Sequence, residues 1–535
     1  MSKIANYLRG HLLGEVDFRP DIRQIYTSDA GVLSLAPEMV VSPRNTDDIR
    51  KVARLSWQLA ERGHIKAITV RGAGRGVMGG AIGQGAIVAT TRHMNNIYEY
   101  DPKQRLVRLQ SGATVGALRQ ALNLQGTDVP ALDGVDAHCT VGGAIAESLA
   151  GLTSGKYGDL SAFVSQLEIV LANGDILQTG QLSRRELSRK KGLQTLEGDI
   201  YRDIDAIIDE YQDVIASLPE YDKSGYSAIA AVKNNSHFDL TPLFLGAQGT
   251  LGVISEMILR TEFRNQSVDV FALVFASTSA ATDAVQILRD AGVAFAEYFD
   301  AQLFNAAIAA GRRFDWYGLD SADPQAVIIA GFDDFNARAR SRNIKRIQRA
   351  FSNANGVKLV AAGEETTDEV LLSALDVARY IELPDRNPAF APRIYSDIRI
   401  PSGRFDEFSK SLEVLSNKLH CSLPVSGHIL AETYTIHPTL SLRQVGDKQK
   451  LFKIFDELSN LALKYNGALI GQSAEGRLAA HFAYKHLDNR TREMYAAIKK
   501  TFDPLGIMNP GVKVGDSLRS LTGMISGDIL PVSDK

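Results

Sequence analysis

The stretch RGAGRGVMGG, Arg71 to Gly80, decides how this sequence is interpreted. Glycine lets a backbone turn its amide groups toward a phosphate, because no Cβ stands in the way. The loop runs through residues 81–85 into AIVAT (86–90), which has the composition of a strand. A dinucleotide-binding Rossmann loop would instead open a helix, and a P-loop would carry GK[ST]. Neither class is indicated, and the loop alone is equally compatible with a glycine-rich turn that has no ligand.

Two further glycine clusters lie downstream of this loop. HCTVGGAIAESLAGLTSGKYG spans His138 to Gly158, and FLGAQGTLGVI spans Phe244 to Ile254. Small residues at this density let a large flat ligand approach the backbone closely. The three clusters together therefore favour a ligand-binding region over an isolated turn.

The segments around the clusters predict a mixed α and β chain. Asn45 is expected to cap a helix that ends at Gly63, and a second helix is expected from Thr114 to Asn123. LEIVLANGDILQTG (167–180) predicts a hairpin whose Asn173-Gly174 pair suits a type I′ turn. From about residue 268 strands alternate with long helices, and the same rhythm returns over residues 393–466, which predicts a separate α+β domain.

Composition and charge exclude several classes of protein. The 59 basic and 62 acidic residues leave a formal charge of -3 in 535 residues, which argues against nucleic-acid binding. The two cysteines form no CxxC pair, so a Cys-ligated cluster is excluded and a reducing compartment is expected. No segment reaches the roughly 20 apolar residues that a bilayer-spanning helix needs. The sequence is thus that of a cytoplasmic protein, with peripheral membrane association and a homodimer both left open.

The ordered motifs resemble a known family. TSDAGVLSLAPEMVVSPRNTDDI (27–49), RGAGRGVMGG, CTVGGAIAESLAG (139–151), GAQGTLGVI (246–254) and DPLGIMNPG (503–511) follow one another. In this order they are similar to the FAD domain of the vanillyl-alcohol oxidase and p-cresol methylhydroxylase superfamily. Within it they most resemble the FAD-linked D-lactate dehydrogenase and glycolate oxidase group.

The resemblance implies a fold and a set of domains. We expect an α+β chain with a p-cresol methylhydroxylase-type FAD-binding domain of two subdomains, an α+β ferredoxin-like substrate or cap domain, and a C-terminal segment that returns to the FAD domain. The expected boundaries are an N-terminal irregular cap at 1–35, the FAD-binding domain at 36–262, the substrate domain at 263–440, the returning segment at 441–515 and a tail at 516–535.

The resemblance also implies which residues meet the cofactor. Residues 71–80 would hold the FAD pyrophosphate, and Val253-Ile254 would meet the isoalloxazine ring. Relatives with covalent FAD carry a histidine where this loop has Arg75 or Gly76, so a noncovalent flavin is expected. The full set of expected FAD-binding residues is Arg71, Gly72, Ala73, Gly74, Arg75, Gly76, Gly79, Thr140, Gly142, Gly143, Ser148, Gly158, Val253, Ile254 and Asn509.

Oxidation of a 2-hydroxy acid needs a cation for the carboxylate and a base or Lewis acid for the hydroxyl proton. Arg379 and Arg393 are candidates for the cation, since paired guanidiniums grip a carboxylate, although solvated surface arginines would fit the sequence equally well. Relatives carry GHxGDGNxH and EHG, which supply two histidines and a glutamate for a divalent metal. His428 and Glu475 match that pattern.

The rest of the metal pattern is not matched. Thr435 occupies the position of the second histidine, with His437 two residues later, and Gly476 replaces the histidine after Glu475. If 428–437 is one continuous strand, His428 and His437 point to opposite faces, while Glu432 and Tyr434 share the face of His428. A metal site made of His428, His437 and Glu475 and a metal-free site with His428 as base both remain open, and Tyr434, Glu475 and His481 are alternative proton carriers.

The sequence-based hypothesis is an FAD-dependent oxidoreductase that oxidises a small 2-hydroxy acid similar to D-lactate or glycolate. The resemblance implies hydride transfer to flavin N5, with electrons passed to a quinone, a cytochrome or an electron-transfer flavoprotein. Two alternatives stay open: a flavin-dependent transferase similar to alkylglycerone-phosphate synthase, and a flavin-binding relative that has lost the ancestral chemistry.

Overall fold

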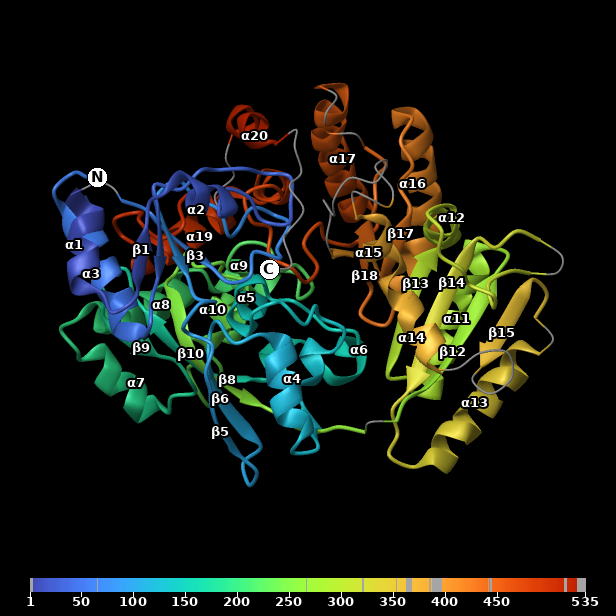
Figure 1. The fold of residues 1–535 in the computed structure, drawn as a ribbon. Coiled ribbons are helices and arrows are strands. Elements are labelled where there is room, and N and C mark those ends of the chain that lie inside the picture. The colour runs from blue at the N-terminus through green and yellow to red at the C-terminus, as the bar shows by residue number, and fades with distance from the viewer. Residues whose placement is uncertain are drawn as a thin grey trace. The chain divides into compact units, whose positions relative to one another are not determined.

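The computed structural model describes residues 3–64, 66–265, 267–319, 322–352, 354–361, 368–383, 386, 397–440, 442, 445–513 and 517–526. The chain divides into two compact units, whose elements are labelled in Figure 1. The first unit comprises residues 1–150, 159–262 and 473–526. The second comprises residues 151–158, 263–472 and 527–535.

A four-stranded sheet forms one part of the first unit. Its order is β1 (Glu15–Asp17), β2 (Met39–Ser42), β4 (Ala86–Ala89) and β3 (Ile68–Arg71). β2 and β3 both run parallel to β4, as buried strands joined by a helical crossover do. Helices α1 (Lys3–His11) and α3 (Thr46–Glu61) bury their apolar faces in the same core as these strands.

The ends of α3 follow the sequence prediction, and the N-terminal region does not. Asn45 is confirmed as the N-cap, because its side chain accepts a hydrogen bond from the Asp48 amide. The prediction of an irregular segment up to residue 35 is wrong. That segment contains α1, β1 and α2 (Pro20–Ile25), and β1 extends the sheet by pairing with β2.

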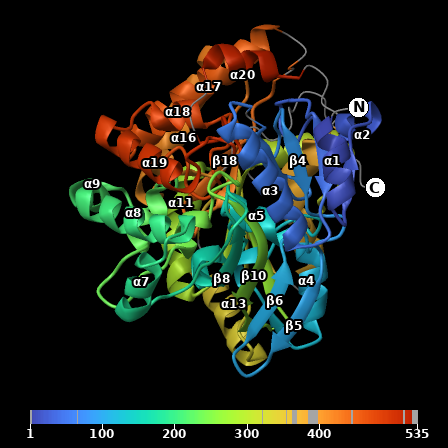
Figure 2. The ribbon, with the colours of Figure 1, turned by 90° about the vertical axis from the view of Figure 1, so that its left-hand side faces the viewer.

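A five-stranded antiparallel sheet forms the other part of the first unit, and strands of this sheet are labelled in Figure 2. Its order is β5 (Ile97–Asp101), β6 (Leu106–Gln110), β10 (Val253–Arg260), β8 (Val164–Val170) and β9 (Ile176–Gln178). The predicted hairpin is confirmed as β8 and β9, but the type I′ turn is wrong. Gly174 alone has positive φ, at 82°, and the Leu171 amide donates to the Asp175 carbonyl. The result is a three-residue loop with glycine in the left-handed position.

The remaining elements of the first unit connect and cover the two sheets. They are α4 (Val115–Asn123), β7 (Thr127–Asp128), η1 (Pro130–Leu132), α5 (Val141–Glu147), η2 (Leu160–Ala162), α7 (Arg184–Lys191), α8 (Leu196–Glu210), α9 (Gln212–Ser217), η3 (Ser227–Ala231), α10 (Thr241–Phe244), α18 (Ala480–Tyr484), α19 (Asn489–Phe502) and α20 (Leu518–Met524), while β11 (Glu262–Phe263) ends the unit. Within the expected tail, α20 is followed by a bridge between Ile525 and Leu33, and Leu521 is buried.

The second unit is built on one seven-stranded antiparallel sheet. Its order is β15 (Val357–Ala361), β12 (Asp269–Phe275), β14 (Ala326–Phe332), β13 (Phe295–Asp300), β17 (Val425–His428), β18 (Thr433–Ile436) and β16 (Ile398–Arg399). Its helices are α6 (Ser154–Tyr157), α11 (Thr278–Ala291), α12 (Ala301–Ala309), α13 (Ala337–Phe351), α14 (Asp368–Ser373), α15 (Val377–Ile381), α16 (Phe405–Leu419) and α17 (Val445–Lys464), with short turns η4 (Ala374–Asp376) and η5 (Ser402–Arg404).

This sheet consists of two ferredoxin-like halves joined at their edges. In the first half the sequence β12-α11-β13-β14-α13-β15 folds with the strand order β15-β12-β14-β13. In the second half β16, β17 and β18 take the matching places, and Ala468 bridges to Arg399 where a fourth strand would lie. β13 pairs with β17 and joins the halves. The repeated strand and helix rhythm predicted from residue 268 is confirmed.

The C-terminal part of the chain belongs to both units. α17 packs on α16 in the second unit, so residues 445–472 are not part of a segment that starts its return at residue 441. The return to the first unit begins at Ser473 and includes α18, α19 and α20.

Candidate functional site

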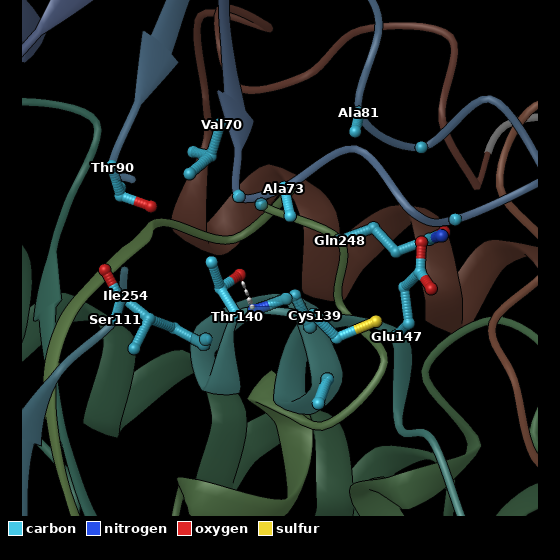
Figure 3. A pocket seen from close by; sticks show the side chains of 18 of the residues that line it. Val70, Ala73, Ala81, Thr90, Ser111, Cys139, Thr140, Glu147, Gln248 and Ile254 are labelled. Carbon is cyan, nitrogen blue, oxygen red and sulfur yellow. Dashed lines mark hydrogen bonds between the residues drawn. The ribbon is translucent and has the colours of Figure 1, made fainter. Parts of the chain in front are cut away.

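The three glycine clusters surround one pocket of the first unit, drawn in Figure 3. The pocket encloses about 840 Å³, counting space that is open to solvent, which is the size range of small-molecule and cofactor sites. Its walls are the loop after β3, the start of α5 and the segment between α10 and β10. The lining residues are Val70, Gly72, Ala73, Gly74, Arg75, Gly76, Gly80, Ala81, Thr90, Ser111, Cys139, Thr140, Gly142, Gly143, Ala144, Ala146, Glu147, Leu149, Phe244, Ala247, Gln248, Gly249, Gly252 and Ile254.

The loop after β3 requires glycine because it lies against other backbone and side chains. A Cβ on Gly72 would lie 2.0 Å from the Thr140 hydroxyl oxygen, closer than any van der Waals contact. Gly74 has a φ of 66°, which side chains rarely adopt, and a Cβ there would lie 2.3 Å from the Arg71 guanidinium. The loop can therefore hold this close approach only with glycine at both positions.

Two buried polar residues, Asp29 and Asn509, hold the loop from behind. The Asp29 carboxylate accepts hydrogen bonds from the amides of Gly31 at 2.9 Å and Gly79 at 3.0 Å. Burial raises the pKa of Asp29 to about 6, although those amides and the Arg71 charge oppose the rise. Asn509 donates from Nδ2 to the carbonyl oxygens of Gly80 at 2.8 Å and Gln248 at 2.6 Å. Asn509 thus ties the first and third glycine clusters together.

α5 supplies the floor of the pocket. Thr140 is its N-cap, and the hydroxyl accepts a hydrogen bond from the Gly143 amide at 3.2 Å (Figure 3). The helix ends at Ser148, which has a left-handed φ of 52°. The capping threonine and the small residues of VGGA bring the helix backbone to the surface of the pocket.

Two residues that line the pocket each carry one buried polar group that lacks a hydrogen-bond partner in the described chain. Within the described part of the chain, Ser111 Oγ and Gln248 Nε2 make no hydrogen bond. Gln248 is held in a left-handed conformation with φ of 50°, and its Oε1 accepts from the Gly476 amide at 2.9 Å. A buried donor left unpaired costs free energy, so both groups suit a polar ligand in this pocket.

Sequence reasoning found part of this pocket. The expected residues that line it are Gly72, Ala73, Gly74, Arg75, Gly76, Thr140, Gly142, Gly143 and Ile254. Arg71, Gly79 and Asn509 stand behind the loop, and Val253 is buried in the core of the first unit. Ser148 caps α5, and Gly158 lies in the second unit as the C-cap of α6. Ser111, Cys139, Glu147 and Gln248 were missed, although the last three stand inside the glycine clusters.

A polar row crosses the sheet of the second unit at the seam between its halves. Glu297 on β13 stands directly opposite His428 on β17, which stands opposite Thr433 on β18, which stands opposite Arg399 on β16. Directly paired residues of an antiparallel sheet share one face. The Glu297 carboxylate lies 2.6 Å from Nδ1 of His428. Burial raises the pKa of Glu297, while the neighbouring His428 opposes the rise.

The segment after His428 is a hairpin, not one continuous strand. Residues 429–432 form the turn between β17 and β18, and Glu432 adopts a left-handed φ of 59° although neither glycine nor asparagine is present. Three residues hold its carboxylate: Ser402 donates from its amide and its hydroxyl, and Arg289 and Arg399 donate from their guanidiniums. The condition under which His428 and His437 would point to opposite faces, one continuous strand over residues 428–437, is therefore not met.

The turn reverses the expected side-chain directions. His437 lies on the same face as His428, buried, with Nε2 2.8 Å from the Ser426 hydroxyl and Nδ1 2.8 Å from Glu382. Tyr434 lies on the opposite face, fully buried and stacked on Phe405 at 4.2 Å between ring centroids. The expectation that Tyr434 shares the face of His428 is wrong, and its surroundings are those of a core residue.

Glu475 is engaged inside the first unit. Its carboxylate lies 2.8 Å from the Lys513 ammonium, and the two side chains are 0% and 1% exposed. The Gly225 amide and the Tyr484 hydroxyl donate to the same carboxylate at 2.8 and 3.0 Å. These contacts do not suit a metal ligand, because a buried ammonium already neutralises the charge. Among the described residues no three His, Cys, Asp or Glu side chains are grouped to hold a metal ion.

The structure describes one of the two arginines that were expected to bind the substrate carboxylate. Arg379 is an exposed residue of α15 in the second unit. Arg393 lies outside the described residues. Arg399, which the sequence did not single out, is the described arginine in the row of His428.

Comparison with protein families now assigns both parts of the chain. Residues 37–180 match the FAD binding domain family, and residues 264–512 match the C-terminal domain family of FAD linked oxidases. The chain belongs to the FAD-linked oxidoreductases of the p-cresol methylhydroxylase type. In this FAD-linked oxidoreductase the pocket-lining residues from Val70 to Leu149 lie within the FAD binding domain match, and those from Phe244 to Ile254 lie between the two matched regions.

Individual relatives resemble this FAD-linked oxidoreductase over most of its length. Glycolate oxidase subunit GlcD of Bacillus subtilis is 25% identical, with 91% of this chain and 92% of the relative covered. D-2-hydroxyglutarate dehydrogenase of Pantoea ananatis is 26% identical over 91% of this chain, but the chain spans only 48% of that relative. The chain thus spans about half the length of several curated relatives.

Solved structures show the same fold at lower identity. An alkyldihydroxyacetonephosphate synthase matches with a TM-score of 0.65 and 15% identity, covering 95% of this chain and 85% of the other. p-Cresol methylhydroxylase matches with a TM-score of 0.67 and 15% identity, covering 94% of each chain.

None of the helices in the described ranges combines the length and apolar content that crossing a bilayer requires.

Proposed function

We propose that this FAD-linked oxidoreductase oxidises a small 2-hydroxy acid of the D-lactate or glycolate kind. The observation that carries the proposal is the polar row Glu297, His428, Thr433 and Arg399 on one face of the second unit. The names of the glycolate oxidase subunit and of the D-2-hydroxyglutarate dehydrogenases support the same class of substrate. When bound, FAD supplies the acceptor for the two electrons that leave the alcohol carbon.

The first unit is proposed to hold the FAD noncovalently. The loop 72–76 and the start of α5 offer backbone without side chains, which suits a flat ligand and its phosphates. Ser111 Oγ and Gln248 Nε2 would gain the hydrogen-bond partners that they lack within the described chain. No histidine occurs between residues 71 and 80 to form a covalent link.

His428 is proposed as the base that takes the hydroxyl proton. A carboxylate at Nδ1 fixes the tautomer in which Nε2 carries the lone pair, and it stabilises the ring once the proton has arrived. Glu297 holds this position at 2.6 Å from Nδ1 and is buried, so it acts as a positioning residue. Glu475 is not needed for this step, because it is occupied by Lys513.

Arg399 is proposed to bind the substrate carboxylate, in place of or together with Arg379 and Arg393. Arg399 and His428 lie two strands apart in one row, about 10 Å between Cα atoms at the usual strand spacing. The Arg399 guanidinium also holds the Glu432 carboxylate, so a substrate carboxylate would have to share this guanidinium with Glu432. The planar guanidinium suits that anion through paired hydrogen bonds.

The test is anaerobic mixing of the flavin-loaded protein with D-lactate, L-lactate, glycolate and D-2-hydroxyglutarate. At least one acid should bleach the visible flavin absorbance, and the matching primary alcohol without a carboxylate should not. His428→Ala should abolish bleaching, whereas Arg399→Ala should raise the required acid concentration by roughly 30-fold or more. Arg379→Ala in parallel separates the two arginines.

If no hydroxy acid bleaches a fully loaded flavin, the proposal fails. The flavin-dependent transferase similar to alkylglycerone-phosphate synthase would then be the better hypothesis, since that chemistry has no net redox turnover. Electrons from the reduced flavin are proposed to leave to a quinone, a cytochrome or an electron-transfer flavoprotein, and adding each acceptor in turn after bleaching tests which one restores the colour.

A further inference from the structure

Helix α13 of the second unit carries one sign of charge on its outer face. Its sequence ARARSRNIKRIQRAF contains no acidic residue. Arg340, Ile347 and Phe351 are buried and fix the inner face against the sheet, where Phe351 contacts Phe275. The cationic residues on the exposed side are Arg338, Arg342, Lys345, Arg346 and Arg349.

These five cations form one continuous stripe. Their spacing is i, i+4, i+7, i+8 and i+11, which places them within about 100° of the helix circumference, opposite the buried face. From Arg338 to Arg349 the stripe extends about 16 Å along the helix axis at 1.5 Å per residue. The cationic stripe therefore forms a convex ridge of side chains along the exposed side of α13, a helix that is labelled in Figure 1.

The acidic side chains of the described residues do not neutralise the cationic stripe. Across the part of the chain that the structure describes, none of its five members forms an ion pair with an acidic side chain. The neighbouring acidic residues of α11 are Asp283 and Asp290, and the contact made there is from Arg346 to the Asp290 backbone carbonyl. Asp269 is occupied by the buried Arg340.

Another helix of the same unit has basic side chains that are paired with acidic ones. On α16, Lys410 pairs with Asp406 and Lys418 pairs with Glu457 of α17. Surface charges of both signs usually alternate in this way, and this protein has a net charge of -3. Five unpaired cations without an intervening anion are thus a local feature of α13 and not an effect of composition.

An exposed aromatic residue stands at the start of the stripe. Phe335 is 69% exposed and immediately precedes Asn336, the N-cap of α13. An aromatic ring beside a basic helix face is the combination that peripheral proteins use at the interface of an anionic bilayer. A convex ridge also suits a flat fluid surface better than a preformed acidic groove in another protein.

We propose that the cationic stripe of α13, with Phe335, docks the protein on a bilayer that contains anionic phospholipids. Each Lys or Arg near such a surface strengthens binding roughly fivefold, and the attraction falls off within a Debye length of about 10 Å. Docking is electrostatic and reversible, since the apolar face of α13 stays buried in the protein. The inference is independent of the substrate proposed above.

The test is flotation of the full-length, flavin-loaded protein with two kinds of vesicle: phosphatidylcholine alone, and an equimolar mixture with phosphatidylglycerol. The protein should bind the anionic vesicles only, and binding should disappear at about 1 M salt, where the Debye length is about 3 Å. Arg342→Glu/Arg349→Glu should weaken binding at least about 30-fold, and Phe335→Ala should weaken it further at fixed salt.

The matched control is Arg185→Glu/Arg189→Glu on α7 of the first unit, which changes the net charge equally at two exposed arginines. This variant should still bind. Equal loss in both double variants would overturn the proposal, because net charge and not the stripe would then govern binding. Absence of binding to the anionic vesicles would also overturn it and would leave an acidic protein as the partner of α13. If the glutamate variant does not fold, Arg342→Gln/Arg349→Gln serves in its place.

Discussion

Removing the Lys513 ammonium should reveal how strongly the first unit depends on the Glu475 ion pair. The two side chains are 0% and 1% exposed and 2.8 Å apart, so neither charge can be solvated when its partner is lost. In Lys513→Met the Glu475 carboxylate would keep only two neutral donors, the Gly225 amide and the Tyr484 hydroxyl. Breaking a buried pair in this way costs about 3–5 kcal/mol.

This loss of unfolding free energy predicts a decrease in Tm. At about 2 °C per kcal/mol for a domain of this size, Lys513→Met should lower Tm by roughly 6–10 °C. The double variant Glu475→Gln/Lys513→Met should recover part of this loss, because it removes the buried charge together with its partner. Lys500→Met, an exposed lysine of α19, should stay within about 0.5 kcal/mol of the wild type.

Scanning calorimetry and urea unfolding of the four proteins, with and without added zinc, give the measurement. If Lys513→Met costs less than about 1 kcal/mol, or if the single and double variants are equally stable, the buried pair does not have the role described. Zinc should stabilise neither the wild type nor the control, because the ammonium occupies the carboxylate. A zinc-induced rise in the wild-type Tm would show that Glu475 is available as a ligand after all.

Four further outcomes are expected. The protein should release intact FAD on acid precipitation, and flavin that stays in the pellet would contradict noncovalent binding. Gly74→Val should abolish FAD binding, because a Cβ there would lie 2.3 Å from the Arg71 guanidinium, whereas Gly10→Ala, with nothing within 4 Å, should keep full flavin. Turnover should persist after chelation of protein purified without chelators, and stoichiometric zinc or manganese with chelator-sensitive activity would refute this. Burial raises the pKa of Asp29 to about 6, so between about pH 4 and 6 the folded protein keeps a proton that the unfolded chain has lost. The contribution of Asp29 to the free energy of unfolding is therefore complete below about pH 4 and is lost as the pH rises through about 6. Between pH 5 and 7 the wild type should therefore lose about 1 kcal/mol more than Asp29→Asn in urea unfolding, and parallel pH profiles would contradict the assignment.

The parts of the pocket that sequence could predict are those that depend on backbone alone. Gly72, Gly74 and Gly143 lie where side chains would clash, and glycine is a signal that a local pattern can carry. Ser111 and Gln248 are ordinary residues whose position against the loop depends on contacts between segments far apart in the chain. Within the described residues Ser111 Oγ and Gln248 Nε2 are buried without a hydrogen-bond partner, and this arises only on folding, so no spacing rule could have found them.

The proposed catalytic face shows which features a local sequence pattern could not predict. Residues 428–437 lack glycine and asparagine, so the local sequence favours a continuous strand over a turn. Glu432 nevertheless takes a left-handed conformation, since Ser402, Arg289 and Arg399 hold its carboxylate there. Tertiary hydrogen bonds outweighed a local cost of about 1–2 kcal/mol and changed which side chains share a face. Glu297 was missed for a related reason, because it lies 131 positions from His428 in the sequence.

The proposed base depends on the junction between the two ferredoxin-like halves. β13 and β17 are each the outermost strand of their own half, and an exposed outer strand invites pairing with another chain. Their pairing removes that hazard on both halves and, at the same position, brings the buried carboxylate of one half against the imidazole of the other. Neither half alone could orient His428. A chain cut between β15 and β16 would therefore expose β13 and β17 as unpaired edge strands, and it would also separate Glu297 from His428. Aggregation and loss of function would then have one common origin.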